Sequence, residues 1–364
     1  MKIGIIGTRG IPNQYGGFEQ FAQYLSAGLA AKGHEVYVYN SSLHSYQENK
    51  YGDVHLIHQK DWENKIGTAG QFIYDLNCIN DSRKRDFDVL LHLGYTSDSL
   101  WWRRWPKRTA HVMNMDGLEW KRSKYGSLTK RFLKWGESLA ARHACSMIAD
   151  SIGIQEYISS KYKKTAVYIP YGATVFSAPD EAVPAQFDIQ AGSYYMLMAR
   201  MEPENNIETV IKGYLGSAVK DELIIIGSTA NKYGSSLVKK YTDKRIRFIG
   251  PVYDQSLVNN LRYYSKLYFH GHSVGGTNPS LLEAMASGSN IIAHDNIFNK
   301  AILNSDASFF LNDRDITTIL DQPVNEIVLQ QRRKNNLEKI EKQFSWQTII
   351  DGYEAVLLSA RDAG

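Results

Sequence analysis

Short apolar runs separated by polar, glycine-containing segments recur along the whole chain. The first run is residues 2–7 (KIGIIG), and residues 35–40 (EVYVYN) form the second. Between them, a helical pattern over about residues 18–32 ends at Gly33, where a helix C-cap glycine belongs. A strand, a helix and another strand in this order predict a parallel sheet covered by helices.

The same alternation continues to the end of the chain. We predict further strands at residues 54–58, 89–93, 111–115, 147–150, 194–199, 222–227, 245–250, 267–269 and 290–294. Two α/β halves of similar size predict two doubly wound, Rossmann-like domains with a cleft between them. We expect these domains at residues 1–175 and 190–343. A linker is expected around 176–192, and a break near residues 344–345 before a terminal helix over 344–364.

Composition narrows the class of protein. The chain has 364 residues, 43% hydrophobic and 22% charged, which is ordinary for globular domains. A net charge of +4 does not indicate a nucleic-acid partner. Cys78 and Cys145 lack metal-ligand spacing, which favours a reducing compartment. Neither a signal-peptide pattern nor an apolar run of membrane-spanning length is present, so we expect a cytoplasmic protein.

A dinucleotide site of the Rossmann type is disfavoured. The glycines at positions 4, 7 and 10 do not form GxGxxG, and the second strand ends in Asn40 rather than in an acidic residue. A P-loop motif is also missing from the sequence.

Residues 269–288 (FHGHSVGGTNPSLLEAMASG) carry the strongest chemical signal. After a predicted strand, Gly275 and Gly276 precede Thr277 or Asn278 as the helix N-cap, and Pro279 suits the first turn. Free backbone N–H groups and the helix dipole at such a site suit a phosphate.

Four other features of the sequence allow both a functional and a structural interpretation. Glu283, about one turn inside this helix, could accept hydrogen bonds from a sugar hydroxyl or be a surface glutamate. Gly16 and Gly17 could approach a ligand closely or form a plain turn. Asp116 follows a strand at the sheet edge where ligands bind, but could instead cap the next turn. His270 and His272 could contact a ligand or only make structural hydrogen bonds.

Residues 103–134 contain ten Lys or Arg against two acids, with tryptophans inside and beside the region. Apolar residues repeat at helical spacing over 128–139, flanked by Lys130, Arg131 and Lys134. A basic helix with aromatic edges suits an anionic membrane surface. The alternative is a solvated charged face over an ordinary core stripe.

Five motifs, in order along almost the whole chain, carry a family resemblance: YGGFE (15–19), IPYG (169–172), ARMEPENN (199–206), PSLLEAMA (279–286) and FSW (344–346). The chain resembles retaining glycosyltransferases of family four, which have the two-domain GT-B fold. GTRGIPNQYGGFE (7–19) and MDGLEWKR (115–122) are similar to a narrower group, bacterial rhamnosyltransferases of capsule and cell-wall polysaccharide assembly.

The resemblance implies an acceptor-binding N-terminal domain, a donor-binding C-terminal domain, and a last helix that packs back on the first domain. Asp116, Arg200 and Glu283 would act in the transfer step, with Arg200 neutralising phosphate charge and Glu283 binding the ribose. The expected donor-binding residues are Gly16, Gly17, Arg200, Asn205, His272, Gly275, Gly276, Thr277, Asn278, Ser280, Leu281 and Glu283. The expected acceptor-binding residues are Tyr15, Asp116, Glu119, Trp120 and Arg122.

The chain departs from the family pattern at three positions. Gly275 stands where a glutamate usually contacts the donor sugar, Asn205 where a lysine usually binds the diphosphate, and Asp116 where many relatives have a histidine.

The resemblance implies a hexosyltransferase that uses no cofactor and no metal. The expected reaction moves a sugar, best rhamnose from dTDP-rhamnose, to a saccharide acceptor with retention. The expected acceptor is a polyprenyl-diphosphate-linked glycan at the inner face of the cell membrane. Two alternatives remain: a nucleotide-sugar epimerase of the GT-B type, which would turn over without acceptor, and a non-catalytic nucleotide-sugar-binding protein.

Overall fold

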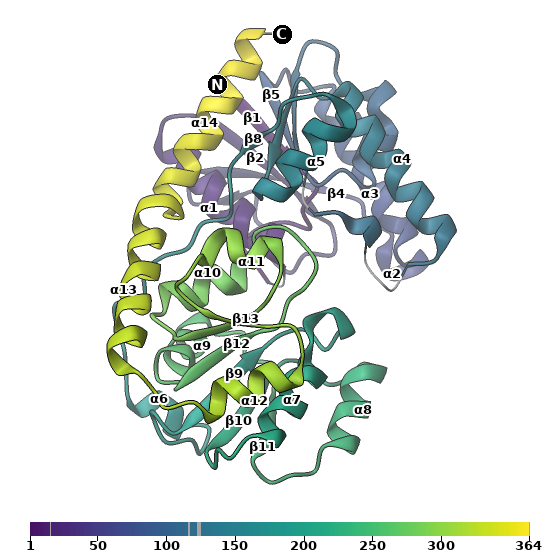
Figure 1. Cartoon of the computed structure of the whole chain (residues 1–364). Coiled ribbons are helices and arrows are strands. Elements are labelled where there is room, and N and C mark those ends of the chain that lie inside the picture. The colour runs from purple at the N-terminus through teal and green to yellow at the C-terminus, as the bar shows by residue number, and fades with distance from the viewer. Residues whose placement is uncertain (15, 116, 122–124, 364) are drawn as a thin grey trace. The chain divides into compact units, whose positions relative to one another are not determined.

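The computed structural model describes residues 1–14, 16–115, 117–121 and 125–363. It divides into two compact units (Figure 1). The first unit comprises residues 1–172 and 346–364, and the second comprises residues 173–345. The chain therefore passes from the first unit to the second and returns for its last helix.

The first unit is built on a mostly parallel sheet. Its strands are β1 (Lys2–Ile6), β2 (Glu35–Ser41), β3 (Lys50–Tyr51), β4 (Val54–Gln59), β5 (Val89–Leu93), β6 (Ala110–Asn114), β7 (Ser146–Ala149) and β8 (Val167–Tyr168). They pair in the order β3-β4-β2-β1-β5-β6-β7-β8, and only β3 runs antiparallel to its neighbour within the described residues. Helices cover both faces of a parallel sheet, so side chains on both faces of each strand are buried. This explains why the strands are continuous apolar runs in the sequence.

Helices cover this sheet, as Figure 1 shows. They are α1 (Gly17–Ala31), α2 (Glu63–Ile66), α3 (Ala69–Ser82), α4 (Ser127–His143), α5 (Ile152–Tyr162) and α14 (Trp346–Ala363), with 3₁₀ turns η1 (Asp98–Arg104) and η2 (Glu119–Lys121). No helix in the described ranges is long and apolar enough to cross a membrane.

The terminal helix α14 packs on α1 and β6 of the first unit. Tyr24 stacks on Trp346 with ring centroids 4.4 Å apart, and the ring centroids of Phe21 and Tyr353 are 5.0 Å apart. Asn114 at the end of β6 donates a hydrogen bond of 2.8 Å to the Tyr353 hydroxyl. Aromatic burial and this hydrogen bond hold the end of the chain to the first unit.

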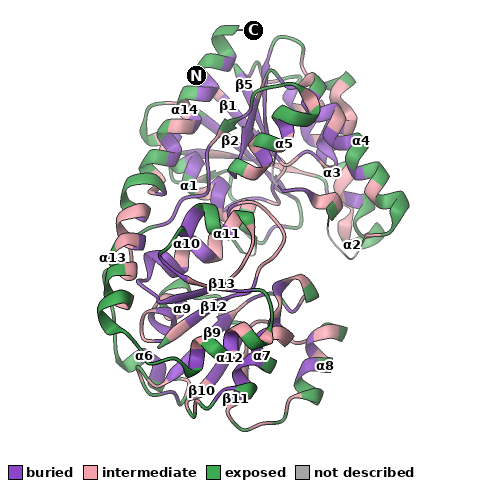
Figure 2. Cartoon of the chain, in the orientation of Figure 1, coloured by how far each residue is buried: buried purple, intermediate pink, exposed green. Residues whose placement is uncertain are grey.

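The second unit has a parallel sheet of its own. Its strands are β9 (Tyr194–Met198), β10 (Glu222–Ile226), β11 (Ile246–Gly250), β12 (Leu267–His270), β13 (Ile291–His294) and β14 (Ser308–Phe310). They pair in the order β11-β10-β9-β12-β13-β14. Figure 2 shows the strands of both sheets as largely buried. The predicted α/β class with two doubly wound parallel sheets is confirmed.

The helices of the second unit are α6 (Ala182–Ala185), α7 (Ile207–Gly216), α8 (Lys232–Lys240), α9 (Gln255–Tyr263), α10 (Pro279–Ala286), α11 (Ile297–Leu303), α12 (Asp313–Asp321) and α13 (Glu326–Gln343), with the turn η3 (Pro203–Asn205). The segment expected to be a linker, 176–192, belongs to this unit instead. Its backbone is held by the hydrogen bonds Phe176 N to Ala286 O and Asp180 N to Asn260 Oδ1.

Gly28 on α1 provides a test of the packing of α14. A Cβ at this position would lie 2.2 Å from Ile350 Cδ1 and 2.8 Å from Cγ1. We expect Gly28→Ala to lower the free energy of unfolding by about 1–3 kcal/mol, despite the better helix propensity of alanine. Urea denaturation followed by circular dichroism measures this change. Ile350→Ala removes the obstructing atoms, so the double variant should lose less stability than the sum of the two single variants. Additive losses would contradict the packing.

Candidate functional site

The turn from β12 into α10 has the predicted local structure. Asn278 is the N-cap, its Oδ1 accepting a hydrogen bond of 2.9 Å from Ser280 N, and Pro279 occupies the first turn. Gly275, in the preceding loop, has a φ of 125°, a conformation that favours glycine. The first turn does not have the free N–H groups expected from the sequence, because Pro279 has no N–H, Ser280 N donates to Asn278 Oδ1, and Leu281 N donates to Asn278 O at 3.0 Å. What the start of the helix offers an anion is the positive end of the helix dipole.

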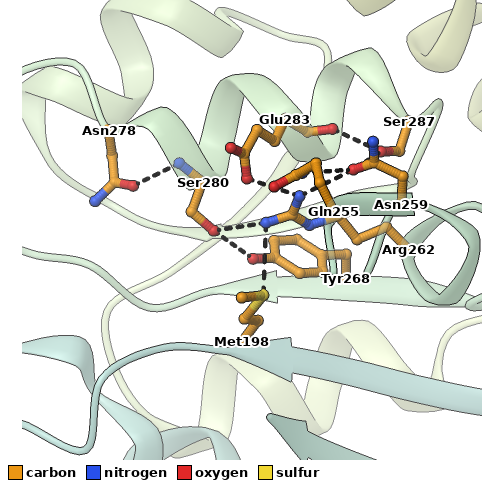
Figure 3. Close-up of polar contacts among 9 residues, drawn as sticks. All are labelled: Met198, Gln255, Asn259, Arg262, Tyr268, Asn278, Ser280, Glu283 and Ser287. Carbon is orange, nitrogen blue, oxygen red and sulfur yellow. Dashed lines mark hydrogen bonds and ion pairs between the residues drawn. The ribbon is translucent and has the colours of Figure 1, made fainter. Parts of the chain in front are cut away.

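Glu283 lies on α10 and faces α9 (Figure 3). Its Oε2 accepts a hydrogen bond of 2.8 Å from Nη1 of Arg262, and its side chain is 19% exposed. The sequence allowed Glu283 to be a surface glutamate. The structure instead shows a mostly buried side chain that is ion-paired with Arg262.

Arg262 is fully buried, and no sequence motif pointed to it. Its Nη2 donates to Ser280 Oγ at 3.0 Å and lies 3.7 Å from Met198 Sδ. Burial lowers the pKa of Arg262, but the Glu283 carboxylate and Tyr268 outweigh this effect, so the pKa is raised and the guanidinium is charged. One sequence feature could have indicated that Arg262 is buried. It lies four residues after Val258, which puts both residues on the same face of α9.

A second arginine, Arg200, follows β9 and has an exposed side chain. Its carbonyl accepts a hydrogen bond of 2.7 Å from Nδ2 of Asn205, whose side chain is buried. Asn205 therefore supports the backbone of Arg200, and a direct contact of Asn205 with a donor stays a prediction.

The loop after β12 is attached to the segment after β9. Asn206 Nδ2 donates to Gly271 O at 2.8 Å, and Ser273 Oγ donates to Glu204 O at 2.7 Å. Gly271 is so close to Asn205 that a Cβ would lie 2.1 Å from the Asn205 carbonyl oxygen. These contacts join the carboxyl ends of β9 and β12, where ligands of parallel sheets bind.

His270, the last residue of β12, and His272, in the loop that follows, stack on each other with ring centroids 4.5 Å apart. Neither ring nitrogen of His270, nor Nδ1 of His272, has a hydrogen-bond partner among the described residues. Burial and the charge of Arg200 lower the pKa of His272 to about 4, and burial, with His272, Arg262 and His294, holds the pKa of His270 well below its usual range. Both imidazoles are therefore neutral at pH 7.

In the first unit, the loop before α1 is held from two sides. Glu19 Oε1 accepts from Arg9 N at 2.9 Å, and Asn40 exchanges two hydrogen bonds with the backbone of Ile11. Gly16 is the N-cap of α1 with a φ of 148°, and Gly17 is the first helical residue. Both glycines follow the carboxyl end of β1.

Part of the predicted acceptor site lies outside the described residues, namely Tyr15, Asp116 and Arg122. Glu119 and Trp120 lie in η2, after β6. Trp120 Nε1 donates to Glu137 Oε2 at 2.9 Å, and Lys134 Nζ lies 4.1 Å from the centre of a Trp120 ring. These contacts hold the Trp120 side chain, which belongs to η2, against α4.

The buried carboxylate of Glu137 ties η2 and α4 to α5. Its Oε1 accepts from Tyr157, Lys161 and Tyr162 at 2.6–2.8 Å.

The structure gathers the predicted donor-binding residues of the second unit at one sheet edge. Arg200, Asn205, His272, the loop from Gly275 to Leu281, and Glu283 all follow or flank β9 and β12. Gly16, Gly17, Glu119 and Trp120 lie at the corresponding edge of the other sheet. In the part of the chain that the structure covers, no group of three or more His, Cys, Asp or Glu is arranged to hold a metal ion.

Comparison with known sequences is informative over nearly half of the chain. Residues 1–174 match a family described as a domain of unknown function, DUF1972. No curated protein matches the sequence.

Solved structures identify the fold. Sucrose-phosphate synthase from Thermosynechococcus elongatus is similar with a TM-score of 0.83 and 15% identity, covering 100% of both chains. HepE from Anabaena, solved in complex with UDP-glucose, has a TM-score of 0.74 and 14% identity, covering 98% of this chain and 99% of its own. An α,α-trehalose 6-phosphate synthase from Burkholderia multivorans has a TM-score of 0.72 and 10% identity, covering 100% and 97%. The chain has the GT-B fold.

The close approach at Gly271 provides a ligand-free test of this site. Because its Cβ would overlap the Asn205 carbonyl, Gly271→Ala must separate the loop from the segment after β9. We expect a loss of about 1–3 kcal/mol in the free energy of unfolding, measured by chemical denaturation. Ser273→Ala removes one of the attaching hydrogen bonds without overlap and should cost about 1 kcal/mol. A fully stable Gly271→Ala variant would contradict the observed attachment.

Proposed function

We propose that this protein is a glycosyltransferase that takes its sugar from a nucleotide-diphosphate donor bound in the second unit. One observation carries the proposal. The capped N-terminus of α10, preceded by Gly275 and Gly276, opens at the sheet edge that also carries Arg200, and an ion-paired carboxylate, Glu283, lies one turn away. A diphosphate matches the positive end of the helix dipole and the arginine, and a ribose matches the carboxylate.

The chemistry of this arrangement suits a departing diphosphate. Negative charge grows on the diphosphate as the bond to the sugar breaks, and the positive N-terminus of α10 and Arg200 stabilise that charge. In the proposed retaining reaction the leaving phosphate itself accepts the proton of the acceptor hydroxyl. Asp116 orients that hydroxyl or acts as its base. No metal takes part in this proposal.

The fold of the solved relatives supports a nucleotide-sugar donor. HepE, which is similar over nearly the whole chain, was solved with UDP-glucose. The sequence motifs support a hexosyltransferase that moves rhamnose from dTDP-rhamnose to a polyprenyl-diphosphate-linked glycan. In the first unit, Glu119 and Trp120 then contact the acceptor.

A lipid-linked acceptor requires access to a membrane, and α4 offers a suitable surface. Leu128 is 79% exposed, Trp135 53% and Phe132 36%, whereas Leu139 further along is buried. The apolar stripe predicted over 128–139 is therefore exposed over the first part of α4. Lys130, Arg131 and Lys134 accompany these apolar side chains. We propose that this part of α4, the α4 patch, holds the enzyme on anionic lipid at the cytoplasmic face.

Donor selection tests the proposed activity. We expect one of dTDP-rhamnose, UDP-glucose, UDP-GlcNAc and GDP-mannose to raise the unfolding temperature by several degrees, and NAD to have no effect. Arg200→Ala and Glu283→Gln should each remove most of the shift, because each deletes a charge that the donor needs. Glutamine at 283 keeps the shape beside Arg262.

Glu222→Ala, which removes a carboxylate paired with Arg247 elsewhere in the unit, is the matched control and should retain the shift. Stabilisation by NAD alone would overturn the proposal. Binding of a donor without acceptor-dependent turnover would favour a non-catalytic binding protein.

Vesicle flotation tests the α4 patch. Reversing Lys130, Arg131 and Lys134 to Glu should lower partitioning onto phosphatidylglycerol vesicles by more than about 100-fold, because losing the three positive charges alone costs roughly 1 kcal/mol for each residue. A matched variant reverses Lys232, Lys239 and Lys244 in the second unit and should bind like the parent. Equal losses in both triple variants would show that only net charge matters, and unchanged binding would exclude the α4 patch as the membrane-binding surface.

A further inference from the structure

Arg262 is difficult to explain by stability alone. A buried ion pair contributes little to folding compared with apolar side chains of similar size. The α9 positions around it follow the ordinary pattern, with Val258 and Leu261 also buried. An apolar residue at 262 would satisfy the core equally well, so the guanidinium calls for another explanation.

The guanidinium reaches two residues of α10 at once (Figure 3). Nη1 donates to Glu283 Oε2 at 2.8 Å, and Nη2 donates to Ser280 Oγ at 3.0 Å. A planar guanidinium has its donors in a rigid fork, so it sets the separation and the direction of both acceptors. Both acceptors are among the residues proposed to bind the donor.

The contacts behind Arg262 keep the fork in place. Asn259 Oδ1 accepts from Arg262 Nη1 at 3.3 Å, from Gln255 Nε2 at 2.9 Å and from Ser287 Oγ at 3.2 Å. The Tyr268 hydroxyl shares a hydrogen bond of 3.0 Å with Ser280 Oγ. The arginine thus lies between α9 and α10 and is held from both.

We propose that Arg262 is a positioning residue of the nucleotide-sugar site. It fixes the position and direction of the Glu283 carboxylate, and it holds Ser280 Oγ by occupying one of its acceptor positions. A carboxylate in a fixed position accepts hydrogen bonds from hydroxyl groups, which is what recognition of a ribose requires. This inference rests on the proposed function, and it adds that donor affinity depends on a side chain that never touches the donor.

The discriminating variant is Arg262→Lys. Lysine keeps a positive charge beside Glu283 but has no fork, so it cannot hold Glu283 and Ser280 together. We expect dTDP-rhamnose or UDP-glucose, whichever the unaltered protein binds, to bind Arg262→Lys about tenfold or more weakly in isothermal titration calorimetry. Arg247→Lys is the matched control. Arg247 also donates to a glutamate and to a second acceptor, Phe187 O, but lies on β11, and this variant should bind like the parent.

A double-mutant cycle separates positioning from a general effect on the fold. If Arg262 acts through Glu283, then Glu283→Gln should weaken binding much less in the Arg262→Lys background than in the parent. If Arg262 only supported the fold, the fold-losses in donor affinity of the two single variants would multiply in the double variant. Multiplying losses, or an Arg262→Lys variant that binds within twofold of the parent, would overturn the inference and leave the proposed function standing.

A second variant keeps the inference testable if Arg262→Lys does not fold. Asn259→Asp retains the acceptor oxygen and adds a negative charge that competes with Glu283 for the guanidinium. It should also weaken donor binding about tenfold, and unchanged binding would overturn the inference. If the unaltered protein binds none of dTDP-rhamnose, UDP-glucose, UDP-GlcNAc and GDP-mannose, the proposed function itself fails, and the inference fails with it.

Discussion

The ion pair between Arg262 and Glu283 is the interaction on which the candidate site depends. A charge in the interior must be paired, and Arg262 finds its partner on α10. The pair connects α10 to α9 and so holds the direction in which the N-terminus of α10 points. The hydrogen bonds between the loops after β9 and β12 complete the same arrangement from the other side.

The elements of the fold were predictable where the local chemistry is strong. Strands such as β5 and β10 are buried apolar runs between polar turns, and their ends agree with the sequence patterns to within a residue. The start of α10 is encoded locally, because Asn278 caps the helix and Pro279 suits its first turn. The edge strands β3, β8 and β14 were missed because runs of two or three residues carry no periodic signal.

The site was predictable only in outline. The motifs indicated which loops carry it, because parallel strands bring their carboxyl ends to one edge. They did not indicate that Arg262 is buried. Helical spacing predicts which residues share one face of a helix, but not which other element packs on that face. The motif also did not indicate that the Asn205 amide donates to the Arg200 carbonyl. Gly275 has no side chain where the proposed family has a glutamate, so we expect His272 to contact the donor sugar.

A crystal structure with a bound nucleotide sugar, dTDP-rhamnose or UDP-glucose, would test the central claim most directly. We predict that the diphosphate lies at the N-terminus of α10, within hydrogen-bonding distance of Arg200. We also predict that a ribose hydroxyl donates to Glu283 while Arg262 remains paired beneath it. A nucleotide bound in the first unit alone, or one that leaves α10 and Glu283 untouched, would contradict this claim.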